Sequence, residues 1–129
     1  MTETPAAVRK GVYALAAATI ATVLFVWSYA DMWNTGALLW PMLVLFGVMD
    51  TAFVILLVLT WRRHNWARWS TVAWTVLGVV TVLWGWTFTE VPTLIDGIAQ
   101  LIIIGIELWG CYHLVSRPAS SWFRLAAAA

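Results

Sequence analysis

Charged residues are scarce in this sequence. Only 10% of its 129 residues are charged, whereas 63% are hydrophobic and the mean hydropathy is +0.86. A soluble domain carries about a quarter charged residues and just under half apolar ones, so these few charges cannot cover a water-soluble fold. The single cysteine, Cys111, excludes an internal disulfide and a cysteine-based metal cluster. Lipid is therefore the expected solvent for most of the chain.

The sequence also lacks the residue sets that carry catalysis. It has no Ser-His-Asp or Cys-His arrangement, no glycine loop that would cradle a phosphate, and no metal-ligand spacing. The two histidines, His64 and His113, are better explained as solvated side chains than as haem or metal ligands. A net charge of +1 implies no nucleic-acid partner. We therefore expect a non-enzymatic protein without a cofactor or metal.

Four apolar stretches cover most of the chain, at residues 11–30, 37–60, 69–88 and 97–116. A helix of about 20 residues, rising 1.5 Å per residue, crosses the hydrocarbon core of a bilayer. Backbone polar groups must be satisfied internally in lipid, so each stretch is predicted to be a helix. The connections between them are short. The sequence thus predicts one all-α transmembrane domain, an integral membrane four-helix bundle.

The basic residues predict the orientation of this bundle. All seven lie near the N-terminus, in the middle loop or near the C-terminus: Arg9, Lys10, Arg62, Arg63, Arg68, Arg117 and Arg124. The other two loops carry Asp31 and Glu90 instead, and Asp96 opens the fourth helix. By the positive-inside rule both termini are cytoplasmic. The one-sided distribution also argues against dual topology.

An internal repeat divides the chain into two halves. Shifted by 59 positions, residues 22–31 lie over 81–90 with Thr, Val, Leu and Trp identical in place, and Arg9 falls on Arg68. We therefore expect two tandem helical hairpins, about 9–61 and 68–117, related by a pseudo-two-fold axis along the membrane normal. The repeat also favours a retained first helix over a cleaved signal peptide.

Each half carries one acid in its second helix, Asp50 and Glu107. Asp50 lies 12 residues before Arg62 and Glu107 lies 10 before Arg117, which places them about 18 Å and about 15 Å into the membrane. An ionised carboxylate there costs at least about 2.5–3.5 kcal/mol. Three alternatives remain open: neutral buried acids, a pair that shares a proton, or a site for an external cation or a partner's basic residue.

Other polar side chains extend this candidate site. Asp96, Gln100 and Glu107 follow helical spacing, so the fourth helix has a partly polar face. Thr75 and Thr81 of the third helix are candidates to hydrogen-bond an acid, although bonding to their own helix is the simpler use. The third helix also presents a small-residue stripe that includes Gly78, which suits close helix contact.

The membrane boundaries are rich in arginine and tryptophan. Arg62, Arg63 and Arg68 are expected to contact anionic lipid head groups. Tryptophans near the helix ends, Trp122 among them, are interpreted as interfacial anchors.

Two short motifs carry a resemblance. Asn65-Trp66-Ala67-Arg68 opens a helix, and Ser121-Trp122-Phe123-Arg124 follows Arg117-Pro118 near the end of the chain. In these motifs the chain resembles a broad group of small, uncharacterised four-helix bacterial membrane proteins. The resemblance implies a bacterial inner-membrane location and brings no activity.

Two functional hypotheses follow from the sequence. The first is a protein that acts through helix–helix contacts with lipid-embedded partners, as an accessory, assembly or immunity-type subunit or as a homo-oligomer. Its motivation is the abundance of apolar surface without a catalytic set. The second is a small proton- or cation-coupled transporter or channel that uses Asp50 and Glu107.

Overall fold

The computed structural model describes residues 4–28, 39–87 and 93–127, and these are entirely helical apart from short turns. The helices are α1 (Ala6–Ser28), α3 (Leu39–Trp61), α4 (Asn65–Gly85), α5 (Leu94–Val115) and α6 (Arg117–Ala127). The first four are long and apolar enough to cross a membrane. The all-helical fold and its four membrane-length helices are therefore confirmed, and α6 is an element that the apolar stretches did not predict.

The short turn between α3 and α4 explains why α4 begins at Asn65, before the third apolar stretch at residues 69–88. The amide of His64 donates to the Leu59 carbonyl at 3.1 Å, and that of Arg63 donates to Thr60 at 3.1 Å. The backbone of Arg63 adopts the left-handed conformation, with φ 71°, at a position after a helix that usually holds glycine. This motif ends α3 and lets α4 begin at Asn65, so the arginine-containing turn of α4 is already helical.

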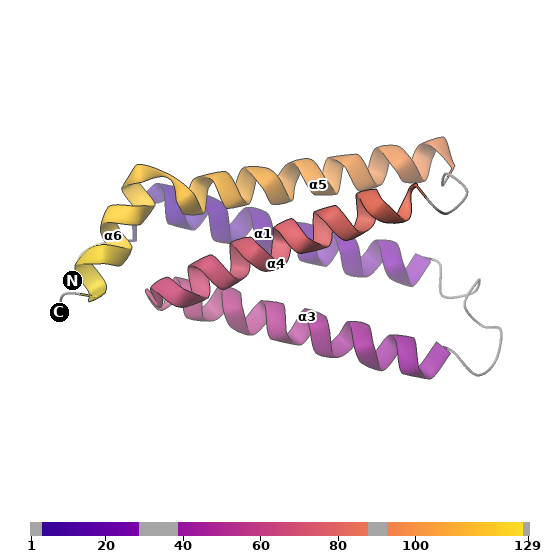
Figure 1. Ribbon diagram of the computed structural model, residues 1–129, viewed down its shortest axis with the longest axis horizontal. Coiled ribbons are helices and arrows are strands. Elements are labelled where there is room, and N and C mark those ends of the chain that lie inside the picture. Colours follow the sequence, from indigo (N-terminus) through magenta and orange to yellow (C-terminus); the bar gives the residue numbers. More distant parts are fainter. Residues whose placement is uncertain (1–3, 29–38, 88–92, 128–129) are drawn as a thin grey trace.

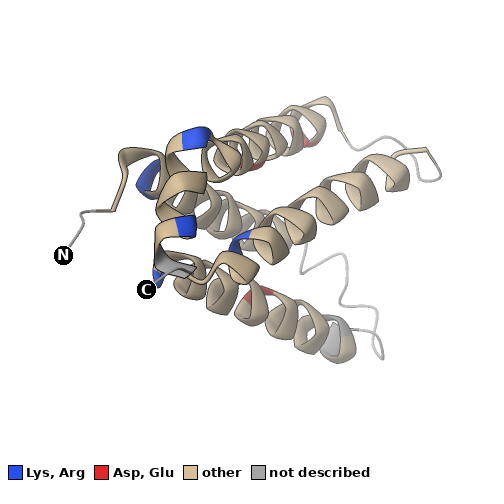
Figure 2. Ribbon diagram, turned by 60° about the vertical axis from the view of Figure 1, so that its left-hand side comes forward, with Lys and Arg blue, Asp and Glu red and all other residues tan. Residues whose placement is uncertain are grey.

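The four long helices form a ring. α1 packs most extensively against α5 and α3 against α4, and smaller interfaces join α1 to α3 and α4 to α5. Figure 1 shows α6 lying across the end that holds both termini, and Figure 2 shows lysine and arginine gathered there. We call this the basic end; it comprises the start of α1, the turn at Arg62–Arg63 and α6.

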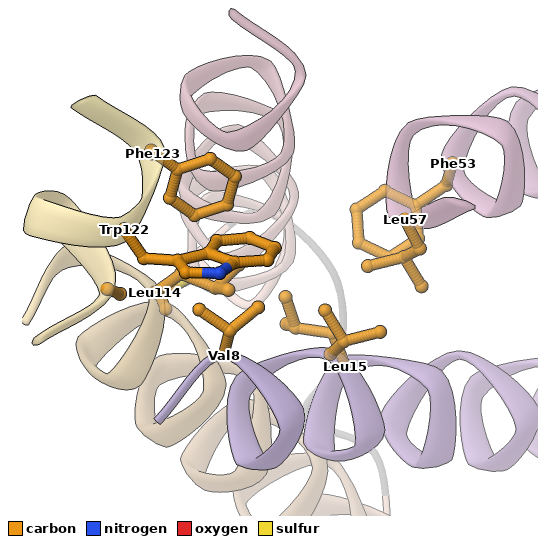
Figure 3. Packing of buried hydrophobic residues seen from close by; sticks show 10 residues of the cluster. Val8, Leu15, Phe53, Leu57, Leu114, Trp122 and Phe123 are labelled. Atoms are coloured by element: carbon orange, nitrogen blue, oxygen red, sulfur yellow. The ribbon is translucent and has the colours of Figure 1, made fainter. Parts of the chain in front are cut away.

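The hydrophobic core lies toward the basic end. Its cluster brings together Val8 and Leu15 of α1, Phe53 and Leu57 of α3, and Leu114 of α5 (Figure 3). Helix α6 completes it with three side chains: Ala119 and Phe123, both 0% exposed, and Trp122, 6% exposed. Trp122 is thus a core residue under α6, where the sequence predicted an interfacial anchor.

The core stops partway along the helices. All described buried residues lie within 8–18, 53–79 and 104–123. No residue whose burial is described in the remaining parts of the four long helices is buried. In Figures 1 and 2, α3 and α5 diverge away from the basic end. The bundle is consequently closed at the basic end and loosely packed toward the opposite end.

Candidate functional site

Asp50 lies beside a groove between α1 and α3. The groove consists of two adjoining hollows of about 370 and about 410 Å³ that share Thr19, Ile20 and Val54. The first hollow reaches Tyr13 and Trp61, whose ring centroids are 5.7 Å apart. The second continues to Asp50, Thr51 and Leu24. We refer to the two hollows together as the α1/α3 groove.

The carboxylate of Asp50 has no hydrogen bond or ion pair with any residue that the structure describes. The neighbouring hydroxyls are already used: Thr19 donates to the Leu15 carbonyl at 2.8 Å, and Thr51 donates to Gly47 at 2.7 Å. Asp50 itself is only partly covered. The groove therefore combines apolar walls with one unsatisfied acidic group.

Glu107 occupies the inward face of α5. It lies three residues after Ile104, four before Cys111 and seven before Leu114, which are 9%, 7% and 0% exposed. Residues at these spacings share one helix face, so Glu107 lies in the centre of the buried stripe. Gln100, one heptad earlier, continues the same stripe toward the opposite end. The predicted polar face of the fourth helix is thus directed into the bundle.

One hydrogen bond and one close approach link this polar face of α5 to α4 and its C-cap. The indole Nε1 of Trp86 donates to Oε1 of Gln100 at 2.7 Å. Nearer the basic end, the side chains of Cys111 and Thr75 lie close to one another. Thr75 also donates to the carbonyl of Thr71 at 3.0 Å. Glu107 lies between these two contacts along α5, without a hydrogen bond or ion pair to another described residue.

Thr81 forms its hydrogen bond within α4 and not with an acid. Its side chain is exposed, and its hydroxyl donates to the Leu77 carbonyl of its own helix at 2.8 Å. The two candidate threonines therefore differ: Thr75 is 5% exposed and lies close to Cys111 of α5, whereas Thr81 is exposed.

The two acids belong to different helix interfaces. Asp50 lines the α1/α3 groove, whereas Glu107 lies on the face of α5 that approaches Thr75 and Trp86. A carboxylate pair that shares a proton needs both groups in one place. The arrangement offers instead two separate acidic positions, one at each of the smaller interfaces of the ring.

The arginines expected at lipid head groups do not share one environment. Arg62 is exposed, but Arg68 is only 5% exposed. The Arg68 guanidinium lies 4.8 Å from the ring centroids of both Trp69 and Phe123, and its NH1 donates to Ser120 Oγ at 3.2 Å. Arg63 is partly buried and lies 4.5 Å from the Trp122 ring centroid. Arg63 and Arg68 thus hold α6 in place, a role that depends on a helix the sequence did not predict.

The sequence did not identify one contributor to these interfaces. Trp86 donates the one hydrogen bond that Gln100 accepts from a described residue. The repeat pairs Trp86 with Trp27 but does not indicate that the Trp86 indole faces α5.

No family model, curated protein or solved structure matches this chain. Among residues 4–28, 39–87 and 93–127, no group of three or more His, Cys, Asp or Glu side chains is placed to hold a metal ion. The candidate site therefore rests on geometry alone. It consists of two acids without hydrogen-bond partners at separate interfaces of a helical bundle.

Proposed function

We propose that this chain is a non-enzymatic integral membrane protein that acts through contacts between its helices and those of another membrane protein or a second copy. One observation carries the proposal: the buried core ends partway along the four long helices. Toward the opposite end, apolar side chains such as Val44, Val48 and Ile95 are 63%, 62% and 78% exposed. Helices in membranes are held together by close packing. Helices of a partner would therefore pack against the apolar side chains that this chain leaves exposed.

Site-specific photo-crosslinking tests this proposal. A photoreactive phenylalanine analogue at Val48 should give protein adducts, whereas the same analogue at Tyr112, 70% exposed and near the basic end, should give few. Adducts of twice the mass in bilayers that contain only the purified chain would show a homo-oligomer. Adducts found only in native membranes would show a different partner. The absence of protein adducts from Val48 in both settings, for a chain that purifies as a strict monomer, would contradict the proposal.

The proposed setting is the bacterial inner membrane, with the basic end and both termini in the cytoplasm. Arg9, Arg62, Arg117 and the other basic residues at one end of the bundle support this orientation through the positive-inside rule. The opposite orientation would place all of them on the outer side.

The proposed architecture is a pair of repeated hairpins about an axis along the membrane normal. The order of neighbours in the ring supports it, because α1 and α4 each contact α3 and α5. So does a local match: Ser28 donates to the Phe25 carbonyl at 2.6 Å, and Thr87, 59 positions later, donates to Trp84 at 2.7 Å. Equivalent hydroxyls thus end the first helix of each hairpin.

A second candidate function is proton- or cation-coupled transport. The observation in its favour is the inward polar face of α5, where Gln100 and Glu107 follow one another toward the core. Four helices are few for a pore, so transport would require an oligomer. Flux into proteoliposomes should be lost in the double variant Asp50→Asn/Glu107→Gln. Flux that persists in this variant would contradict an acid-coupled mechanism.

A further inference from the structure

We propose that the α1/α3 groove is the docking site for a transmembrane helix of a partner protein that carries a lysine or arginine near mid-membrane, which pairs with Asp50. This inference deepens the proposed function, on which it rests, by naming the surface and the chemistry of the partner.

The dimensions of the groove suit a helix. It follows α3 from Trp61 to Asp50, which is 11 residues or about 16 Å of helix axis. Its rims are formed by outward apolar side chains: Tyr13 and Ile20 of α1 are 63% and 62% exposed, and Val54 of α3 is 48% exposed. A third helix seated between α1 and α3 would cover these side chains along about three turns.

Asp50 specifies the charge of that helix. Burying an ionised carboxylate in a bilayer is costly unless a partner group compensates it. The structure supplies none among the described residues, because the hydroxyls of Thr19 and Thr51 donate to backbone carbonyls of their own helices. A lysine or arginine at the same depth on a docking helix would supply the missing counter-charge and hydrogen-bond donors.

A second copy of this chain does not meet that requirement. Its basic residues lie near its N-terminus, at residues 62–68 and beyond residue 116, whereas Asp50 lies about 18 Å along the helix from Arg62. A parallel copy would therefore present no basic side chain at the depth of Asp50. Lipid acyl chains can cover the apolar walls of the groove, but they offer no group that pairs with a carboxylate. Charge complementarity thus favours a helix from a different protein.

The test uses a defined probe. A labelled Leu/Ala transmembrane peptide of about 20 residues with one central lysine is reconstituted with the full-length chain, and association is measured by energy transfer in bilayers. A matched peptide with leucine at the centre controls for apolar packing. Asp50→Asn should weaken binding of the lysine peptide about tenfold, the loss expected for one polar contact between membrane helices. Glu107→Gln, an acid at the other interface, should leave binding unchanged.

A second variant separates charge from shape. Val54→Trp fills the groove while Asp50 is kept, and it should also weaken binding of the lysine peptide. Equal association of the lysine and leucine peptides, or equal binding by the Asp50→Asn variant, would overturn the inference. The inference would also be overturned if labelled copies of the chain show energy transfer to one another and this association displaces the peptide. The occupant of the groove would then be a second copy. Crosslinks from Val48 do not depend on Asp50, so the proposed function can survive such a failure.

Discussion

Gly11 of α1 and Gly110 of α5 lie against one another where these two helices cross. A Cβ atom added to Gly11 would be 3.0 Å from the carbonyl oxygen of Gly110, and one added to Gly110 would be 3.2 Å from that of Gly11. Each added atom would also meet a leucine side chain, Leu114 or Leu15, at 2.9 Å. The absence of both side chains therefore lets the two backbones approach closely, as in other small-residue crossings in membranes.

Under the proposed repeat, this glycine crossing has no counterpart at the α3–α4 interface. With the offsets of 59 and 57, Gly11 would correspond to Ser70 and Gly110 to Phe53, which are larger residues. The α3–α4 interface is also less extensive than the α1–α5 interface. Both interfaces join one proposed hairpin to the other, so the two hairpins would pack more closely on the side of α1 and α5.

Alanine at either glycine should destabilise the bundle. The added methyl groups of Gly11→Ala and Gly110→Ala meet backbone oxygen atoms, which cannot rotate away as a side chain can. Overpacking of this kind costs about 1–3 kcal/mol. The free energy of unfolding, measured by denaturant titration in mixed micelles, should fall by that amount. Gly105→Ala is the matched control on α5, because its Cβ would meet nothing within 4 Å; an equal loss in this control would refute the crossing.

Phe123 should determine whether α6 remains docked. Its ring is 0% exposed and lies 4.8 Å from the guanidinium of Arg68, so its removal opens a cavity and also exposes a buried cation. A Phe→Ala change in a core costs about 3–5 kcal/mol, and detachment of α6 provides a route to limit that cost. Phe123→Ala should therefore accelerate hydrogen exchange of the α6 amides by at least about tenfold.

Leu125→Ala is the control for this experiment, because Leu125 lies on the same helix and is 65% exposed. Exchange in this variant should match the unaltered chain. If the two variants exchange alike, the contacts of α6 with the core contribute little to its docking.

The sequence predicted the membrane helices well and the contacts between them poorly. Apolar length alone identified the four spans, because the hydrocarbon core sets the minimum length of a crossing helix. It did not predict α6, whose apolar residues Ala119, Trp122 and Phe123 occupy one face of a short, arginine-containing segment. The same limitation led to the expectation that Arg68 contacts lipid head groups, since its contacts with Ser120 and Phe123 depend on α6.

Glycines illustrate the remaining difficulty. The stripe of small residues on α4 predicted a close contact at Gly78, yet a Cβ there would meet nothing within 4 Å. The close crossing uses Gly110 and Gly11, and Gly11 is followed at helical spacing by Ala14 and Ala18, a second run of small residues that we did not single out in the sequence. Lipid-facing and partner-facing surfaces in a membrane are both apolar, so hydrophobic periodicity does not distinguish them. The inward face of α5 was more predictable, because Gln100 and Glu107 are polar and favour the interior.

Trp86 and Gln100 should stabilise the bundle as a coupled pair. Their hydrogen bond of 2.7 Å joins α4 to α5 toward the end opposite the basic residues, where no described side chain of the long helices is buried. A double-mutant cycle with Trp86→Phe and Gln100→Leu should give a coupling energy of about 1 kcal/mol, typical of polar contacts between membrane helices. Thr81→Ala combined with Gln100→Leu should be additive, because Thr81 bonds to its own helix. Additivity of the first pair would show that the bond does not contribute to stability.

Orientation can be tested with two matched cysteine substitutions. Thr87 lies at the end of α4 opposite the basic residues, and Ser121 lies in α6. Both side chains are exposed, and each hydroxyl donates to the carbonyl three residues earlier, so replacement by a thiol is conservative in both. The native Cys111, 7% exposed, should contribute little background. An impermeant maleimide should label Thr87→Cys in intact spheroplasts and Ser121→Cys only after lysis. Labelling of Ser121→Cys alone in intact spheroplasts would invert the proposed orientation, and labelling of both would show that the basic residues do not fix a single topology.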